Sequence, residues 1–270
     1  MLSPAERDAE LSRLLALPHG TRTTTTLLDP PLVLVDGASF VAQYQDIYLR
    51  ECYAFPCRRL SPTIIDGGAN IGAATIWWRS RWPKAQVIAI EPDPQIFEVL
   101  RHNTRFLRGV ELRQCALAGG EPARFWTEGT DAGRLEPGRP DDRSLVQVST
   151  MPLSDVLRTL RRVDLLKLDI EGAETEVLEE AAAHLAKVDR IFVEYHSVVN
   201  RQQTLSRLVG LLERQEYRYY LESASGRFRP FHGVPVDRGI DFQCNLWAWA
   251  GERRRSVAHE ELPGASLPHS

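Results

Sequence analysis

The sequence predicts an α/β fold whose central sheet is mostly parallel. From Thr63 onward, short apolar runs alternate with helical patterns, which is typical of βαβ units. A cluster of small residues directly follows the first apolar run, and ligands of such sheets bind at the carboxyl ends of strands. The last two β-rich runs are joined by a loop, residues 224–241, which permits an antiparallel pair at the sheet edge.

An amphipathic helix is expected at the start of the chain. Ser3 supplies a capping side chain, Pro4 suits the first helical position, and Glu6 completes a capping box. The following segment, "TRTTTTLLDPPLVLVDG", is rich in β-formers and broken by proline and glycine, so strands around a turn are expected. Residues 1–57 are therefore predicted to form a helix and strand appendage to the main domain.

The main domain is predicted to span residues 58–250. Its expected strands are "TIID", "QVIAIE", "VELRQCAL", "DLLKLD", "RIFVEY", "YRYYLES" and "FQCNLWAWA". Helices are expected over residues 73–81, 95–106 and 174–187 and within "QTLSRLVGLLERQ". Residues 128–143 lack any periodicity and predict a long loop or lid, and residues 251–270 predict a disordered tail.

Composition and charge narrow the classes of function. With 43% hydrophobic and 26% charged residues the chain has ordinary globular composition, and its net charge of -3 lacks the basic field typical of nucleic-acid binding. No uninterrupted apolar run reaches about 18 residues, and the first residues do not resemble a signal peptide. We expect a cytoplasmic protein with no membrane span and no nucleic-acid partner.

The cysteines predict neither a zinc site nor a disulfide framework. They lack CxxC pairing and are sparse, so free thiols are expected at Cys52, Cys57, Cys115 and Cys244. Trp77 and Trp78 are interpreted as core residues of the first helix of the main domain.

The stretch "IIDGGANIG" predicts a ligand-binding turn between a strand and a helix. Gly67, Gly68 and Gly72 permit a tight turn, and small side chains let a ligand approach the backbone. Glu91 ends the next strand, where it can accept hydrogen bonds from both hydroxyls of a ribose. The turn is therefore expected to hold a nucleoside-bearing cofactor.

The composition of this turn favours one class of cofactor. A dinucleotide site requires G-x-G-x-x-G, whereas this loop begins with Asp66 and contains Asn70, neither of which helps to bind an anion. An acid at that position suits a cofactor with a cationic amino-acid end, such as S-adenosylmethionine, directly or through water. A nicotinamide-dependent oxidoreductase is the alternative, and a non-catalytic nucleotide-binding module is a third interpretation.

A second group of acids follows the fourth strand, in "VDLLKLDIEGAETEVL". Asp169 stands at the carboxyl end of the strand, and Glu171 and Glu174 flank the start of the next helix. Glu174 also has a purely structural explanation, because acids stabilise helix N-termini. Lys167 shares a face with Asp169 and is expected to pair with a neighbouring acid.

The fifth strand brings Glu194 and His196 to the same edge of the sheet as Asp169. Two roles are open for these residues. His196 could be the general base that removes a proton from an acceptor hydroxyl. Alternatively, Asp169, Glu194 and His196 could hold a divalent cation such as Mg²⁺ that orients and acidifies that hydroxyl.

Four motifs, "IIDGGANIG", "AIEPDP", "PLSDVL" and "DLLKLDIEGAETEVL", resemble those of the FkbM family of S-adenosylmethionine-dependent methyltransferases. They occur in family order within residues 42–250, and the lysine-acid-x-acid-Gly-x-acid motif is the most specific. The resemblance implies a class I (Rossmann-like) methyltransferase fold with a seven-stranded, mostly parallel sheet and an antiparallel last strand. It also implies methylation of hydroxyls on natural products, sugars or lipids.

The resemblance also implies roles for individual residues. Asp66, Gly68, Asn70 and Gly72 would line the methionine end of the cofactor, and Glu91 would hold the ribose. Cys115, where the family often has asparagine, and Ala116 would pass near the adenine. Glu51 and Tyr53 match a Glu-x-Tyr of the cofactor lid, within residues 1–57. The full expected sets are, for the cofactor, Glu51, Tyr53, Asp66, Gly67, Gly68, Asn70, Gly72, Glu91, Cys115, Ala116 and Asp169, and, for catalysis, Asp169, Glu171, Glu194 and His196.

The combined expectation is an S-adenosylmethionine-dependent O-methyltransferase that acts on a small-molecule hydroxyl by in-line transfer. Acceptor choice is expected to depend on the appendage, on residues 128–143, and on the loop that carries Phe228, Phe231 and His232. We also hypothesise that arginines at 134, 139, 143, 227 and 229 meet an acidic group of the acceptor. The sequence leaves open the acceptor, oxygen against nitrogen methylation, metal dependence and whether the chain forms a homo-oligomer.

Overall fold

The structure is a computed structural model that describes residues 3–121, 123–126, 134–135, 145–224, 232–233, 236 and 239–251. The expected disordered tail lies outside this described part, apart from Gly251. Of the expected loop at residues 128–143, only the backbone of Arg134–Leu135 is described. Phe228, Phe231 and the hypothesised arginine side chains are also outside it, whereas His232 is described and exposed.

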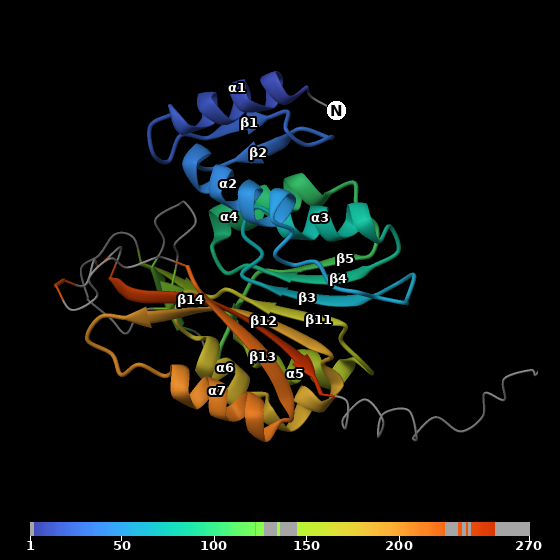
Figure 1. Ribbon diagram of the computed structural model, residues 1–270, viewed down its shortest axis with the longest axis vertical. Coiled ribbons are helices and arrows are strands. Elements are labelled where there is room, and N and C mark those ends of the chain that lie inside the picture. The colour runs from blue at the N-terminus through green and yellow to red at the C-terminus, as the bar shows by residue number, and fades with distance from the viewer. Residues whose placement is uncertain are drawn as a thin grey trace, which may run out of the picture.

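A seven-stranded sheet forms the centre of the chain (Figure 1), in the strand order β13-β14-β12-β11-β3-β4-β5. Neighbouring strands run parallel from β12 to β5, whereas β14 is antiparallel to both β12 and β13. The predicted sheet and its antiparallel last strand are therefore confirmed. The strands are β3 (Thr63–Gly67), β4 (Gln86–Ile90), β5 (Val110–Arg113), β11 (Leu165–Leu168), β12 (Arg190–Val198), β13 (Tyr217–Ser223) and β14 (Ile240–Ala250).

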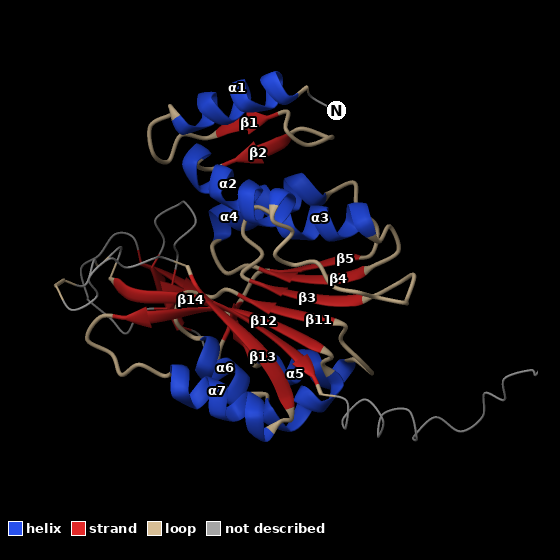
Figure 2. Cartoon of the chain, viewed as in Figure 1, coloured by secondary structure: helices blue, strands red, loops and turns tan. Residues whose placement is uncertain are grey.

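Helices cover both faces of this sheet (Figure 2). One face carries α3 (Ala73–Arg81) and α4 (Pro94–Thr104), and the opposite face carries α5 (Leu153–Thr159), α6 (Glu174–Glu180), the 3₁₀-helix η2 (Ala182–Lys187) and α7 (Leu205–Arg214). Buried aliphatic side chains of α5, α6, η2 and α7 pack with the inner faces of β11, β12 and β14 in one large core cluster. Trp77 and Trp78 of α3 are 3% and 0% exposed, so the prediction that they are core residues is confirmed.

The N-terminal appendage contains α1 (Pro4–Leu15), the antiparallel pair β1 (Thr23–Thr25) and β2 (Leu32–Leu34), α2 (Gly37–Tyr44) and the π-helix η1 (Gln45–Leu49). The capping box of Ser3 and Glu6 is formed as predicted. Apolar residues of this appendage share a core cluster with Ile71, Ile76, Ile96 and Val99 of the main domain. Asn103 of α4 stabilises the contact between the appendage and the main domain. Its side chain accepts a hydrogen bond from Val33 N at 3.0 Å and donates to Val33 O and Ile71 O, each at 2.9 Å.

Three features differ from the expected elements. The run "VELRQCAL" is not one strand, because Ala116 N leaves the sheet edge and donates to Ser149 O, which starts the short parallel pair of β6 (Ala116–Leu117) with β10 (Thr150–Met151). The expected helix over residues 174–187 divides into α6 and η2. The sequence did not predict the helices α2 and η1, because only strands around a turn are expected from the segment that ends at Gly37, whereas Asp36 caps α2.

The remaining strands, β7 (Ala123–Trp126), β8 (Arg134–Leu135) and β9 (Leu145–Val148), form a small antiparallel sheet in the order β8-β7-β9. All four cysteines are free thiols, as predicted. Within the described part of the chain, no helix has the length and apolar character that crossing a membrane requires.

Candidate active site

Two pockets open at the carboxyl ends of the parallel strands, and they share residues. The inner pocket is lined by the turns after β3, β4 and β11, including Gly68, Glu91 and Ile170, and by Cys115 and Ala116. The outer pocket lies between α2, η1 and Tyr53 on one side and β12 and β14 on the other. Asn70, Asp169 and Glu171 line both pockets, so these three residues mark the junction.

At the base of the junction, the turn after β3 and the turn after β11 lie in close backbone contact. Gly68 has φ +75°, and a Cβ at this position would lie 1.8 Å from Asp169 O. Asp169 N donates to Gly67 O at 3.1 Å, and the ammonium of Lys167 donates to Gly68 O at 2.6 Å. Only glycine permits this contact, because any side chain would push the turn after β3 away from the turn after β11.

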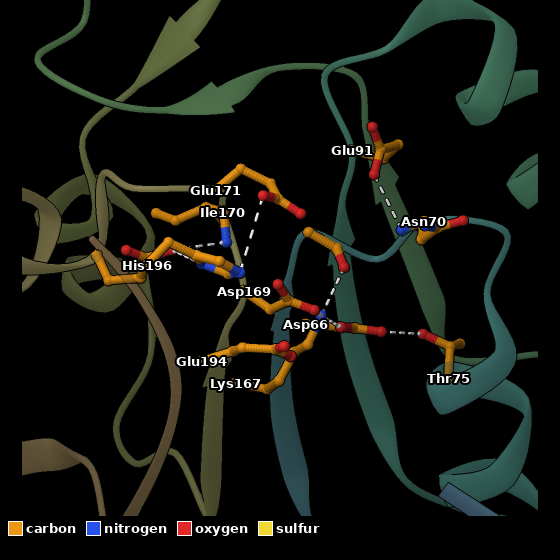
Figure 3. Close-up of polar contacts among 12 residues, drawn as sticks. Asp66, Asn70, Thr75, Glu91, Lys167, Asp169, Ile170, Glu171, Glu194 and His196 are labelled. Carbon is orange, nitrogen blue, oxygen red and sulfur yellow. Dashed lines mark hydrogen bonds and ion pairs between the residues drawn. The ribbon is translucent and has the colours of Figure 1, made fainter. Parts of the chain in front are cut away.

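Glu91 is a buried carboxyl group on the wall of the inner pocket. Its Oε2 accepts from Asn70 N at 2.9 Å (Figure 3). Its Oε1 accepts from Asp93 N at 2.9 Å, and the two hydrogen bonds fix the side chain. Burial raises its pKa to about 7, and the two backbone donors oppose this effect. Each oxygen retains a lone pair, so the carboxylate can accept further hydrogen bonds from a ligand.

Lys167 links two acids beneath the junction. Its Nζ lies 3.5 Å from Asp66 Oδ1 and 3.4 Å from Asp169 Oδ2, which confirms the predicted pairing with a neighbouring acid. Burial alone would lower the pKa of Lys167, but Asp169, Asp66 and Glu194 outweigh burial and raise it. Asp66 is fully buried and accepts from Thr75 at 2.8 Å, and burial raises its pKa despite the nearby ammonium.

His196 faces a second group of acids. Its Nδ1 lies 3.0 Å from Glu174 Oε1 and its Nε2 lies 3.8 Å from Glu171 Oε2 (Figure 3). Burial alone would lower the pKa of His196, but Glu174, followed by Glu171 and Asp169, raises it to about 10. Glu174 beside Nδ1 favours a ring proton on that nitrogen, and Nε2 is the nitrogen that faces Glu171.

Glu194 points into the outer pocket but belongs to a different set of contacts. Its Oε1 accepts a hydrogen bond from Gln243 Nε2 on the neighbouring strand. Burial and then Asp169 raise its pKa to about 8, while His196 and Lys167 act in the opposite direction. Among the residues that the structure describes, Asp169, Glu171 and His196 have ligand atoms that all lie within 4.8 Å of one another, and Glu194 is not part of this group.

Comparisons with known proteins identify the family. A model of the methyltransferase FkbM domain matches residues 66–219, which is more than half of the chain. The chain belongs to the FkbM methyltransferase family. Methyltransferase sdnD of Sordaria araneosa is 31% identical over 194 residues, which cover 56% of this chain and 75% of the relative.

Two further comparisons concern a more distant relative and a solved structure. The 2-O-methyltransferase NoeI of Sinorhizobium fredii is 26% identical over 153 residues, covering 50% of this chain and 63% of the relative. A crystal structure of methyltransferase FkbM from Methylobacillus flagellatus has a TM-score of 0.48 and 19% identity, covering 76% of this chain and 48% of that chain. The chain is thus similar to these proteins while differing from each at most positions.

In this FkbM methyltransferase, several of the residues expected to bind the cofactor lie outside both pockets. Asp66 is turned toward Thr75 and Lys167, and Gly67 packs against Leu117 and Leu168 instead of facing a pocket. Gly72 starts α3, where a Cβ would meet Leu100 and Thr104 of α4. Glu51 pairs with Arg81 and is 44% exposed. These residues do not line the two pockets, and their contact with a cofactor stays a prediction.

The other expected residues do line the pockets. Gly68, Glu91, Cys115 and Ala116 belong to the inner pocket, and Tyr53 belongs to the outer pocket. Glu194 and His196 line the outer pocket, and Asn70, Asp169 and Glu171 line both.

Sequence reasoning missed two parts of the site. Glu174 was explained equally well by the helix dipole, yet its carboxylate is 1% exposed and contacts His196. The wall of the outer pocket formed by α2 and η1 was missed with these helices, as was the row Asp241, Gln243 and Asn245 on β14. The alternation of polar residues along "DFQCN" was the available signal for this row.

Proposed function

We propose that this FkbM methyltransferase uses S-adenosylmethionine as methyl donor and methylates a hydroxyl group of a small-molecule acceptor. The observation that carries the proposal is the meeting of the two pockets at Asp169 and Glu171. In-line transfer between two substrates requires donor and acceptor sites that share one junction, because the reacting atoms must come within about 3.5 Å of each other.

The inner pocket fits the nucleoside part of this cofactor. Glu91 offers buried carboxylate oxygens to the ribose hydroxyls. Ile90, Ile96 and Phe125 supply apolar walls for a flat base.

The amino-acid end of the cofactor would lie toward Asn70 and Asp169. Asp66 contributes indirectly, since it holds Lys167, whose ammonium donates to Gly68 O and fixes the turn. This differs from the sequence-based expectation that Asp66 meets the cationic end directly or through water, because the Asp66 side chain is completely buried.

When bound, S-adenosylmethionine supplies a methyl group on a sulfonium centre that an acceptor oxygen attacks in line. Asp169 and Glu171 both line the two pockets, so these carboxylates are placed to accept the hydrogen bond, and then the proton, of the acceptor hydroxyl. Glu171 and His196 complete the polar junction, and Tyr53 and Phe192 give the outer pocket apolar surface that excludes water. A hydroxyl acceptor is further supported by the relative NoeI, which is named as a 2-O-methyltransferase.

Isothermal titration with S-adenosylhomocysteine, and separately with NADH, tests the cofactor. We expect S-adenosylhomocysteine to bind and NADH to be inert. Glu91→Ala should weaken S-adenosylhomocysteine binding about 10- to 100-fold, since it removes a charged hydrogen-bond acceptor. Glu98→Gln, which changes an exposed acid of α4, is the matched control and should bind as the wild type does. NADH binding without S-adenosylhomocysteine binding would instead support the oxidoreductase interpretation.

Turnover separates a methyltransferase from a non-catalytic nucleotide-binding module. With a panel of hydroxylated acceptors, Asp169→Asn and His196→Ala should lower turnover at least tenfold more than they weaken S-adenosylhomocysteine binding. Loss of cofactor binding in His196→Ala would contradict the assignment of this residue to the acceptor side of the junction.

A further inference from the structure

The junction between the two pockets contains a group of side chains suited to a metal ion. Asp169, Glu171 and His196 each offer one ligand atom, and these atoms all lie within 4.8 Å of one another. Asp169 and Glu171 line both pockets, and His196 lines the outer pocket. A cation held here would stand between the cofactor and the acceptor.

A buried carboxylate fixes the orientation of His196. Glu174 is 1% exposed, and its Oε1 contacts His196 Nδ1 at 3.0 Å. The same oxygen accepts from Ile170 N at 3.2 Å and from Gly172 N at 3.0 Å, so the turn after β11 holds it in place. The opposite ring nitrogen, Nε2, is thereby turned toward Glu171 (Figure 3). Histidine ligands of metals are typically oriented by such a carboxylate on their second nitrogen.

The charges around the junction favour a cation. Acidic side chains outnumber the basic ones here. Lys167 lies within 3.5 Å of Asp66 and Asp169, His196 lies within 3.8 Å of Glu171 and Glu174, and Glu194 interacts electrostatically with both basic side chains. Lys167 compensates mainly Asp66 and Asp169, from beneath the junction. A divalent ion on the pocket side would reduce the mutual repulsion of the remaining carboxylates.

We propose that Asp169, Glu171 and His196 bind a divalent first-row transition metal ion, such as Mn²⁺, that contacts the acceptor hydroxyl. The catalytic role of the ion rests on the proposed methyltransferase function. The binding of the ion by these three residues does not depend on that function. One imidazole nitrogen with two carboxylates favours Mn²⁺ and its neighbours over Mg²⁺, which prefers oxygen ligands alone.

The spacing of the ligand atoms is slightly wider than octahedral coordination of one ion requires. With metal-ligand distances of about 2.1 Å, adjacent ligands lie about 3.0 Å apart and opposite ligands about 4.2 Å apart. The separation of 3.8 Å between His196 Nε2 and Glu171 Oε2 is between these values, and the outer limit of 4.8 Å requires a contraction of only about half an ångström. Glu194 is not in this set, and Gln243 already donates to its Oε1. The ligand set therefore differs from the sequence-based one in having Glu171 instead of Glu194.

Titration of the full chain with Mn²⁺, followed by the electron paramagnetic resonance signal of the free ion, tests the proposal. We expect one bound ion per chain and little displacement by a tenfold excess of Mg²⁺. His196→Ala and Glu171→Gln should lower Mn²⁺ affinity more than about 100-fold, and Glu174→Gln about 10- to 100-fold through the lost orientation of the ring. Glu222→Gln, an exposed acid of the same pocket outside the cluster, is the matched control and should bind within twofold of wild type.

Thermal unfolding in the presence of EDTA shows which variants remain folded, and Glu171→Gln keeps the test decisive if His196→Ala does not fold. Wild-type protein that leaves Mn²⁺ free at millimolar concentration, or ligand variants that bind it as wild type does, would overturn the proposal. Displacement of Mn²⁺ by equimolar Mg²⁺ would overturn the assigned metal class. S-adenosylhomocysteine titration in EDTA tests the proposed function separately, so S-adenosylhomocysteine binding without Mn²⁺ binding would reject the metal site alone.

Discussion

Replacing Gly68 with alanine should separate the two turns that form the floor of the active site. The left-handed φ of +75° costs a non-glycine residue about 1–2 kcal/mol. The new Cβ would lie 1.8 Å from Asp169 O, and since Cβ contacts closer than 3.0 Å essentially never occur, the backbone must move by at least 1.2 Å, the difference of the two values. Such a shift would break the hydrogen bond from Asp169 N to Gly67 O, now 3.1 Å, and strain the one from Lys167 to Gly68 O.

The combined cost is about 4–5 kcal/mol, with about 1 kcal/mol for the backbone hydrogen bond and about 2 kcal/mol for the charged one. For a chain of this size this corresponds to a fall in melting temperature of about 10–15 °C. Gly120→Ala is the matched control, because Gly120 has φ +97° but its Cβ would meet only Pro152 side-chain atoms at 3.5 Å. The melting temperature of Gly120→Ala should therefore fall by only about 2–6 °C, which corresponds to the cost of the left-handed backbone conformation alone.

Differential scanning fluorimetry measures the melting temperatures of both variants. Titration with S-adenosylhomocysteine measures how each substitution changes the affinity of the inner pocket for this ligand. Gly68→Ala should also weaken S-adenosylhomocysteine binding at least tenfold, because the turn lines the inner pocket. Melting temperatures of the two variants within about 3 °C of each other would refute the view that the close approach to Asp169 O excludes every side chain.

Three further changes test other contacts. Because the pKa of Glu91 is raised to about 7, its carboxylate is increasingly protonated below that pH and loses acceptor capacity, so S-adenosylhomocysteine affinity measured by calorimetry should fall by up to about tenfold per pH unit below 7. Glu91→Gln should abolish this dependence. Lys167→Met leaves the buried Asp66 and the partly buried Asp169 without their cation and should cost about 3–5 kcal/mol in chemical denaturation. Asn103→Ala removes the hydrogen bonds to Val33 and should cost about 1–3 kcal/mol, with faster proteolysis of the appendage.

Specific outcomes would contradict each of these expectations. A pH profile of binding that is the same for wild type and Glu91→Gln would show that another group titrates. Wild-type stability of Lys167→Met would mean that the ammonium does not compensate the acids below the junction. Equal rates of proteolysis for Asn103→Ala and wild type would show that apolar packing alone holds the appendage in place.

The sequence by itself determined the alternation of strands and helices from Thr63 onward, the family motifs and the edge of the sheet at which the two pockets open. Local patterns carry this information, because the periodicity of a strand or helix and the glycines of a turn depend on residues that are close together in the sequence. Only the tertiary structure decided which side chains meet. Glu174 contacts His196 from another element, and Glu171 takes the place that Glu194 was expected to have beside Asp169.

The same reason explains why the surroundings of Asp66 do not follow from its motif. Asp66 stands at the right position in its motif, but Thr75 and Lys167 turn its carboxyl group away from both pockets. The wall formed by α2 and η1 is also absent from any local pattern, because it depends on how the appendage packs on α3 and α4. Contacts between residues distant in sequence depend on the packing of whole elements, and no spacing within one segment encodes them.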